Sequence, residues 1–206
     1  LEATAVAMRD TDQDLTSVLV VRADCSIQSL EDLRGKTVGV GAGDSPQATL
    51  IPLNHLAEAG LTPEEDFQVR YFDVLVGKHG DHIGGERDAA RALMAGEVDV
   101  ACMIDGNHLL FSQEGTLPSG QTRILAQTAP YDHCCFTVLN DAPKALVDRF
   151  VDLLMGMSFD DPEVRPLLEL EGLKEWRDGR VSGFAQLNEA CDRFGYLDKF
   201  LLGMSA

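Results

Sequence analysis

Residues 36–60 read KTVGVGAGDSPQATLIPLNHLAEAG and contain the clearest strand-to-helix transition of the chain. The apolar residues 36–40 predict a buried strand. The strand ends in a glycine-containing loop at 41–44, after which Ser45 is placed to cap a helix. Gly60 follows the last apolar residue of that helix and predicts its end. A strand that passes through glycines into a capped helix leaves backbone N–H groups available, and these can bind an anion or a polar ligand.

On both sides of this stretch, strand and helix patterns alternate with short connections. Strands are predicted at 16–22, 36–40, 68–72, 98–104 and 123–127, and helices at 46–59, 86–95 and 108–113. This order predicts an α/β fold with a doubly wound, mostly parallel sheet. Ligands bind such sheets at the carboxyl ends of the strands. We therefore expect a binding site in the loops 41–49, 77–86 and 105–108, with 128–134 close by.

The C-terminal part has a different character. After a strand at 135–139, helices are predicted at 143–157, 162–170 and 184–194, with no further strand. The first of these helices has an apolar stripe formed by Leu146, Phe150, Leu153 and Leu154. Because an apolar face must pack on something, the tail either covers the first sheet or belongs to a second sheet that lacks its leading strands.

Composition limits the possible functions. The 206 residues are 45% hydrophobic and 25% charged, which is typical of a globular protein of one large domain or two lobes. The net charge of −17 argues against nucleic acid as a partner. No apolar run reaches the roughly 20 residues of a membrane span. Five cysteines without a CxxC pair do not predict a disulfide framework. No signal peptide is recognised, and the start at Leu1 suggests a trimmed chain.

A group of potential metal ligands gives an alternative interpretation. His79, His82 and Glu86 lie close together in a glycine-rich segment, and His133 precedes Cys134. Imidazole, carboxylate and thiolate groups bind divalent transition metals such as zinc. The metal hypothesis places the ion on His79, His82, Glu86 and His133. The competing interpretation is that these are polar loop residues that hydrogen-bond a ligand or the backbone.

Four segments together resemble a known family. They are SLEDLRGKTVGVG at 29–41, LIPLNHLAEAGL at 50–61, ARALMAGEVDVACM at 90–103 and DDPEVRPLLELEGL at 160–173. Their content and order are similar to the phosphate/phosphonate-type periplasmic solute-binding proteins of ABC transporters, which have the type 2 periplasmic-binding-protein fold. The resemblance spans about residues 15–200.

The resemblance implies two lobes. Residues 28–130 would form a complete α/β lobe. Residues 1–27 and 131–206 would supply hinge strands, at 14–22 and 133–139, and a partial, helix-rich second lobe. Family members are longer at the N-terminus, so the first part of lobe one is expected to be absent. The partial lobe should then expose an apolar face or pair with another segment, for example in a homodimer.

The resemblance also implies contacts for the ligand. Family members carry a hydroxyl-rich run at the helix start where this chain has Ser45-Pro46-Gln47-Ala48, so Ser45 is kept and Gln47 replaces a hydroxyl by an amide. A family histidine corresponds to Glu86, and acidic family contacts fall near Asp105 and near Asp132-His133. The full set of predicted ligand-binding residues is Asp44, Ser45, Gln47, Ala48, Thr49, His79, His82, Glu86, Asp105 and His133.

The function expected from these observations is capture of a small polar or anionic solute, such as phosphate or a phosphonate, in a cleft between lobes. No catalysis is expected, an ABC transporter permease is the expected partner, and the expected compartment is periplasmic or extracellular, with the cytoplasm left open. Two alternatives remain: a metal-binding protein or metal-dependent enzyme using His79, His82 and Glu86, and the ligand-sensing domain of a regulator.

Overall fold

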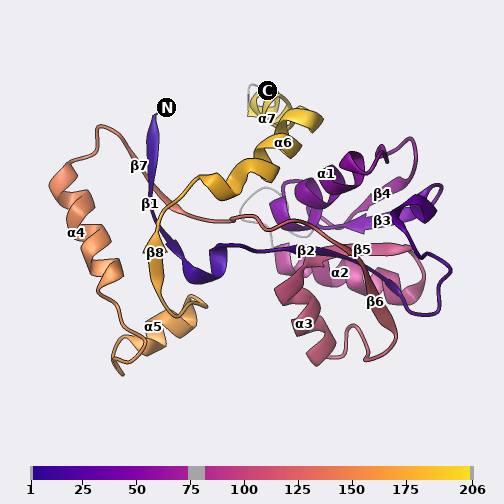
Figure 1. Cartoon of the computed structure of the whole chain (residues 1–206), viewed down its shortest axis with the longest axis horizontal. Coiled ribbons are helices and arrows are strands. Elements are labelled where there is room, and N and C mark those ends of the chain that lie inside the picture. Colours follow the sequence, from indigo (N-terminus) through magenta and orange to yellow (C-terminus); the bar gives the residue numbers. More distant parts are fainter. Residues whose placement is uncertain (1, 74–81, 205–206) are drawn as a thin grey trace. The chain divides into compact units, whose positions relative to one another are not determined.

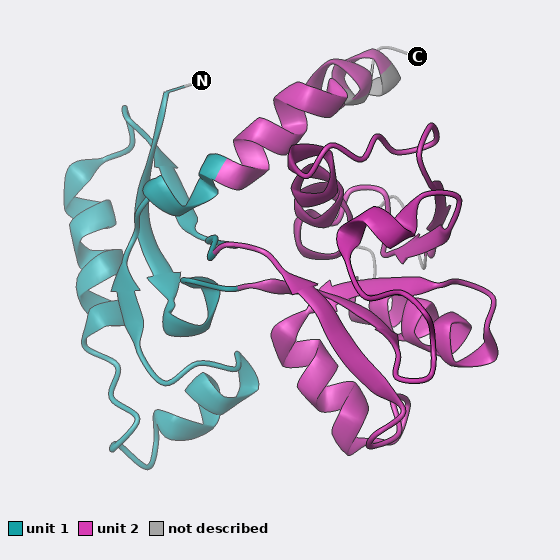
Figure 2. Ribbon diagram, turned by 45° about the vertical axis from the view of Figure 1, so that its right-hand side comes forward, with its two compact units in different colours: residues 1–15, 130–185 teal, residues 16–129, 186–206 magenta. Residues whose placement is uncertain are grey.

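The computed structural model describes residues 2–73 and 82–204. The chain forms two compact units, which are coloured separately in Figure 2. Unit 1 comprises residues 1–15 and 130–185, and unit 2 comprises residues 16–129 and 186–206. The chain therefore passes between the units three times, after residues 15, 129 and 185.

Unit 2 contains a five-stranded sheet in the order β4-β3-β5-β2-β6 (Figure 1). Its strands are β2 (Ser17–Arg22), β3 (Thr37–Val40), β4 (Gln68–Tyr71), β5 (Val100–Ile104) and β6 (Thr122–Gln127). Strand β3 pairs in parallel with β4 and β5, whereas β2 pairs antiparallel with β5 and β6. Four strands thus run in one direction, as predicted, and β2 runs against them.

Alternation along β2 and β5 places apolar side chains on both faces of this sheet. Leu19 of β2 belongs to a buried cluster that includes residues of the helix α1 (Ile51–Glu58). Val20 belongs to a second buried cluster that includes residues of α2 (His82–Ala95) and α3 (Asp105–Gln113). Helices therefore cover both faces, which confirms the doubly wound architecture.

Two helices begin earlier than the sequence pattern indicates. Helix α2 starts at His82 rather than at Glu86, so Gly84 and Gly85 are helical. Gly85 is needed there because a Cβ atom would lie 2.6 Å from the carbonyl oxygen of Phe72. Helix α3 starts directly at Asp105, with Ile104 as its extended N-cap residue, instead of at residue 108. The first turns of α2 and α3 contain glycine and polar residues without the apolar periodicity of a helix, so the sequence pattern predicts a loop there.

Unit 1 contains a three-stranded antiparallel sheet in the order β7-β1-β8. Its strands are β1 (Ala3–Arg9), β7 (Phe136–Leu139) and β8 (Trp176–Asp178). The expectation of a tail with no strand after residue 142 is wrong, because β8 pairs with β1 from the other end of the chain. Only tertiary pairing stabilises so short a strand, which has no periodic signal of its own.

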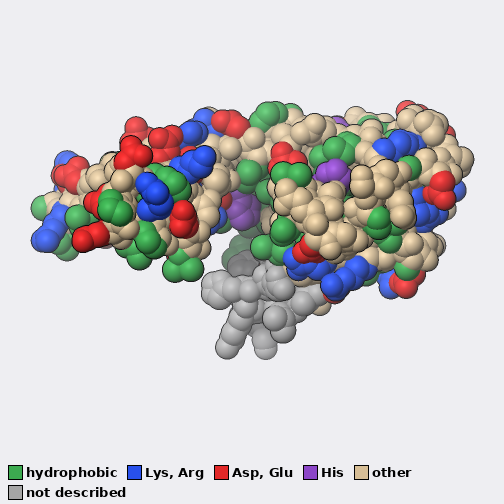
Figure 3. All heavy atoms as spheres, turned by 90° about the horizontal axis from the view of Figure 1, so that it is seen from below, with side chains coloured by type: hydrophobic (Ala, Val, Ile, Leu, Met, Phe, Trp, Pro, Cys, Tyr) green, Lys and Arg blue, Asp and Glu red, His purple; other side chains and the backbone are tan. Residues whose placement is uncertain are grey.

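Helix α4 (Lys144–Met155) in unit 1 has no buried residue. Leu146 and Leu153 on its predicted apolar stripe remain 66% and 64% exposed. This confirms the expectation of an exposed apolar face in unit 1, and Figure 3 shows apolar side chains at the surface among charged ones. The homodimer that could cover this face stays a prediction.

The helices after α4 divide between the units. Unit 1 includes α5 (Arg165–Leu170). The helices α6 (Ala185–Phe194) and α7 (Tyr196–Met204) group almost entirely with unit 2. Phe194 packs against a core cluster of unit 2, and Arg193 donates a 2.6 Å hydrogen bond from Nε to Asn54 Oδ1. The boundaries expected from the sequence, 28–130 against 1–27 and 131–206, therefore differ from the observed units at both β2 and the C-terminal helices.

Candidate functional site

The loop between β3 and α1 is built around Ser45. Its hydroxyl oxygen accepts a 3.2 Å hydrogen bond from the backbone N–H of Ala48, which confirms the predicted N-cap. The first turn, Pro46–Leu50, is a π-helical turn that continues into α1. The hydroxyl of Thr49 donates to the carbonyl oxygen of Ala42 at 2.7 Å. Ser45, Ala48 and Thr49 are buried, so these residues shape the loop from within.

Gln47, in the same loop, has a buried polar atom without a hydrogen-bond partner. Its side chain is 6% exposed, and its buried Oε1 atom has no hydrogen-bond partner. The backbone of Gln47 is held by the hydroxyl of Ser17, which donates to the Gln47 carbonyl oxygen. A buried amide oxygen without a donor costs about 1–3 kcal/mol. Gln47 is therefore a candidate ligand contact in unit 2.

Acidic side chains flank the same loop. Asp44 is exposed, and the N–H of Gly43 donates to Asp73 Oδ1 at 2.8 Å. Partial burial raises the pKa of Tyr196, and the negative charge of Asp44 raises it further. The N-terminal dipole of the helix start favours negative charge in a ligand, whereas the neighbouring acidic side chains favour hydrogen-bond donors.

Glu86 has a structural role that sequence reasoning missed. Its side chain is fully buried, and Oε2 accepts hydrogen bonds from the Ile104 N–H at 3.0 Å and from Asn107 Nδ2 at 2.8 Å. These bonds tie α2 to the junction of β5 and α3. Glu86 is fully buried, and its contact with a ligand stays a prediction.

The remaining predicted residues of unit 2 have local partners or lie outside the described part. Asp105 Oδ2 accepts a 2.8 Å hydrogen bond from the Thr16 hydroxyl. Arg87, next to Glu86 on α2, forms an ion pair with Glu114 at 2.9 Å. His79 lies outside the described residues, and for His82 only the backbone is described.

His133 lies in unit 1, where it meets Asp12 and Cys134. Its Nδ1 atom is 3.5 Å from Asp12 Oδ1 and 3.0 Å from Cys134 Sγ. The hydrogen bond with Asp12 raises the pKa of His133 to about 9, against the effect of burial. Burial alone would raise the pKa of Asp12, but hydrogen bonds from His133 and Arg9 lower it overall. The sequence hypothesis placed His133 with Glu86, and the structure gives it different partners.

Asp132, next to His133, is also satisfied within unit 1. Arg180 holds its carboxylate by two hydrogen bonds, from Nε to Oδ2 at 2.6 Å and from Nη2 to Oδ1 at 2.7 Å. This bidentate pair lowers the pKa of Asp132. Neither Arg180 nor Asp12 was singled out from the sequence, since a single Arg or Asp outside a motif gives no signal until the chain brings distant segments together.

The comparisons with known proteins agree on one fold. A family model described as "ABC transporter, phosphonate, periplasmic substrate-binding protein" matches residues 1–182. Among solved structures, PhnD1 of Prochlorococcus marinus in complex with methylphosphonate aligns with a TM-score of 0.72 at 15% identity. That alignment covers 94% of this chain and 72% of the other. A comparison with curated proteins found no match.

Two further structures give the same result. XAC2383 of Xanthomonas citri, bound to a chloride ion, aligns with a TM-score of 0.70 at 21% identity, covering 96% of this chain and 72% of the other. The phosphonate transporter binding protein PA3383 of Pseudomonas aeruginosa aligns at 0.63 and 14%, covering 100% and 76%. At these identities the structures show the type 2 periplasmic-binding-protein fold alone. Because the family model spans most of the chain, the protein belongs to the periplasmic substrate-binding proteins of phosphonate ABC transporters.

Proposed function

We propose that this protein binds a small phosphonate or phosphate ion at the start of the helical segment 46–58, with Gln47 as the selective contact. The single observation that carries this proposal is the buried, unpartnered Oε1 atom of Gln47 at a helix N-terminus. Membership of a solute-binding family supports it, and so does the methylphosphonate in the related PhnD1 structure.

The chemistry of Gln47 suits a partly protonated anion. A phosphonate monoanion has one P–OH group, which can donate to the Gln47 oxygen, and negatively charged oxygens, which suit the N-terminal end of a helix. A glutamine amide can also turn over and offer its two N–H donors instead. The amide can therefore serve both protonation states of the ligand, whereas the hydroxyl of Ser45 is already used to cap the helix.

Delivery of the solute to an ABC transporter permease in the periplasm follows from the family as a proposal. The family consists of transporter binding proteins, which supports solute binding as the function. None of the helices in residues 2–73 and 82–204 has the length and apolar content that a bilayer crossing requires.

The test is calorimetric titration of the full chain with methylphosphonate, phosphate and sulfate. We expect saturable binding of at least one phosphorus oxyanion and weaker binding of sulfate, which has no proton to donate near neutral pH. At one hundred times the dissociation constant, the bound ligand should add about 2.7 kcal/mol to the free energy of unfolding.

Gln47→Leu removes the amide at nearly constant volume and should weaken binding tenfold or more. Gln68→Leu, at an exposed position of β4 in the same unit, is the matched control and should bind as the wild type does. Equal affinities of Gln47→Leu and the wild type would refute the assignment of Gln47. An absence of oxyanion binding by the wild type would refute the proposed ligand class.

A further inference from the structure

We propose that Asp12, His133 and Cys134 of unit 1 form a binding site for a zinc ion. The three residues offer a carboxylate oxygen, an imidazole nitrogen and a thiol sulfur, and these atoms all lie within 4.8 Å of one another. Carboxylate, imidazole and thiolate are the protein ligands that Zn²⁺ takes. This site does not include the loop of Ser45 and Gln47, so the inference stands apart from the proposed function.

The backbone of unit 1 holds the three residues in place. Asp12 follows β1, and His133 and Cys134 precede β7, the antiparallel partner of β1. The N–H of His133 donates to the carbonyl oxygen of Asp12 at 2.9 Å. Further along, Leu15 and Tyr131 exchange two backbone hydrogen bonds of 2.8 Å. Pairing on both sides of the cluster therefore sets the positions of its Cα atoms before any ion binds.

The polar contacts converge on one atom. Nδ1 of His133 is 3.0 Å from Cys134 Sγ and 3.5 Å from Asp12 Oδ1. An imidazole nitrogen carries at most one proton, so it can donate to only one of these two neighbours at a time. A metal ion with bonds of about 2.0–2.3 Å can contact all three donors together, and donor atoms around a tetrahedral ion lie about 3–4 Å apart.

Arg9 holds Asp12, one of the proposed zinc ligands, by hydrogen bonds. Its guanidinium donates to Asp12 through Nε at 2.6 Å and Nη2 at 3.0 Å, and its Nη1 donates to the carbonyl oxygen of Glu171 at 2.9 Å. Each carboxylate oxygen has more than one lone pair, so Asp12 retains acceptor capacity toward His133. Partners of this kind orient metal ligands and strengthen binding. Ionised Asp12 and the Cys134 thiolate bring two negative charges to Zn²⁺, and Arg9 places one positive charge beside them.

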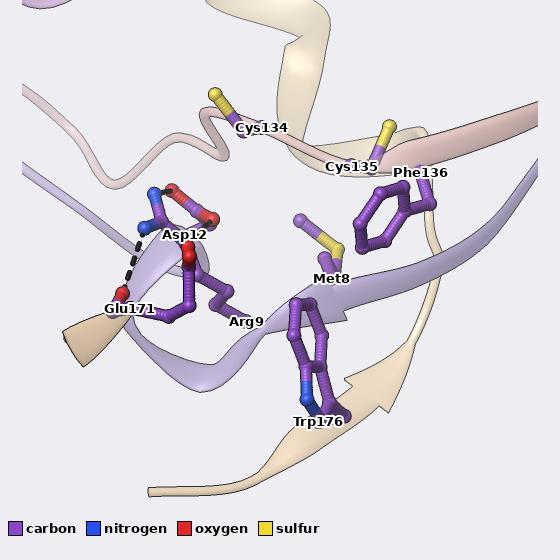
Figure 4. Close-up of a pocket in the computed structure, with 8 residues that line it drawn as sticks. All are labelled: Met8, Arg9, Asp12, Cys134, Cys135, Phe136, Glu171 and Trp176. Atoms are coloured by element: carbon purple, nitrogen blue, oxygen red, sulfur yellow. Dashed lines mark hydrogen bonds and ion pairs between the residues drawn. The ribbon is translucent and has the colours of Figure 1, made fainter. Parts of the chain in front are cut away.

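The proposed zinc site is closed on the side of Asp12 and open to solvent on the side of Cys134. Asp12 is buried, the His133 side chain is 23% exposed, and Cys134 is exposed. Asp12 and Cys134 also line a cavity of about 150 Å³, shown in Figure 4. Met8 and Cys135 line the same cavity, which adds soft sulfur atoms to the surroundings. Three protein ligands beside an accessible cavity leave a fourth position for water or a small ligand.

Metal binding here is a ligand exchange with a defined proton balance. Zn²⁺ loses water molecules and takes the carboxylate, the neutral imidazole and the thiolate, while the thiol proton and any imidazole proton pass to the solvent. Proton release on addition of zinc is therefore a second readout beside the heat of binding.

The experiment titrates the full chain, stripped with a chelator and kept reduced, with zinc chloride in a calorimeter. We expect one ion per chain, with release of protons to the buffer. Co²⁺ in place of Zn²⁺ should give a thiolate-to-metal charge-transfer absorption, which reports directly on Cys134. Cys134→Ser and His133→Gln should each weaken zinc binding tenfold or more and remove or reduce that absorption.

Cys135→Ser is the matched control, because Cys135 is the adjacent residue and lines the same cavity without belonging to the cluster. It should bind zinc as the wild type does. Circular dichroism checks that each variant is folded. The proposal is overturned if the wild type takes up no stoichiometric zinc, or if Cys135→Ser loses as much affinity as Cys134→Ser. Methylphosphonate titration of the wild type separates such a failure from a failure of the proposed function.

Discussion

The two units of this protein reach stability by different means. Unit 2 has a five-stranded sheet with a buried apolar cluster on each face. Unit 1 has a three-stranded sheet, a helix α4 without a buried residue, and two buried carboxylates, Asp12 and Asp132, each paired with an arginine. Apolar burial dominates in unit 2, whereas ion pairs and backbone pairing carry a larger share in unit 1.

This difference has an energetic meaning. Full burial of a leucine side chain contributes about 1.5–3 kcal/mol, whereas an exposed leucine contributes little. A bidentate arginine mainly offsets the large free-energy penalty of burying a carboxylate, and the pair adds little net stability. The stability of unit 2 should therefore change little when polar side chains are substituted, and unit 2 should resist thermal unfolding. The stability of unit 1 should depend on pH and on substitutions that change charge.

The largest effect is expected in the core of unit 2. Leu56→Ala in α1 should lower the free energy of unfolding by about 3 kcal/mol, because Leu56 is fully buried. Leu146→Ala in α4 should change it by less than about 0.5 kcal/mol, because Leu146 is 66% exposed. Urea denaturation followed by circular dichroism measures both values. A loss at Leu146 as large as at Leu56 would mean that the exposed face of α4 is covered in solution.

The next effect concerns the charge pair of unit 1. Arg180→Met should destabilise the protein by about 2 kcal/mol at neutral pH, since it leaves the Asp132 carboxylate without its arginine. Because the native pKa of Asp132 lies below its usual value, its contribution is complete above the unfolded pKa and is lost as the pH falls through the native pKa. The difference between wild type and Arg180→Met in thermal unfolding should therefore shrink in acid. A difference that is independent of pH would contradict the pairing.

His133 should make unit 1 sensitive to alkaline pH. Its pKa of about 9 lies above the unfolded value of about 6.5, so its contribution is complete below pH 6.5 and is lost as the pH rises through 9. Within that window, stability should fall by at most about 1.4 kcal/mol per pH unit, measured in the presence of a chelator. His133→Gln should remove this slope, and His55→Gln on α1 should retain it.

The smallest effect is expected at the helix cap of unit 2. Ser45→Ala should cost about 1 kcal/mol of stability, because the N–H of Ala48 loses its acceptor. Ser45→Asn offers another capping side chain and should recover part of that loss in the same thermal unfolding measurement. If Ser45→Ala abolishes methylphosphonate binding without any loss of stability, the hydroxyl contacts the ligand instead of capping the helix.

Much of unit 2 could be predicted because its signals are local. The apolar strand at 37–40, the cap at Ser45 and the left-handed Gly60 that ends the helix all depend on neighbours within a few residues. Unit 1 was harder, because β1 and β8 are joined across most of the chain and neither has a clear periodic pattern. Long-range pairing supplies their hydrogen bonds, and sequence patterns do not report it.

The residues of the candidate site also differ in whether their role depends on local sequence or on distant partners. Ser45 and Gln47 were singled out because a helix start is a local feature. The contacts of Glu86 with Ile104 and Asn107 could not be predicted, because these partners come from another strand and helix. Asp12 was missed altogether, because it meets His133 only through the antiparallel pairing of residues that are far apart in the chain.

The alternation of strands and helices, the capped helix start at Ser45 and the apolar stripe of α4 follow from the sequence, because these features depend on periodicity and on the chemistry of adjacent residues. The contacts of the buried carboxylates and the convergence of donor atoms depend on the three-dimensional fold. The hydrogen bonds that Glu86 Oε2 accepts, and the placement of Asp12 beside His133 and Cys134, form between segments that the fold alone brings together.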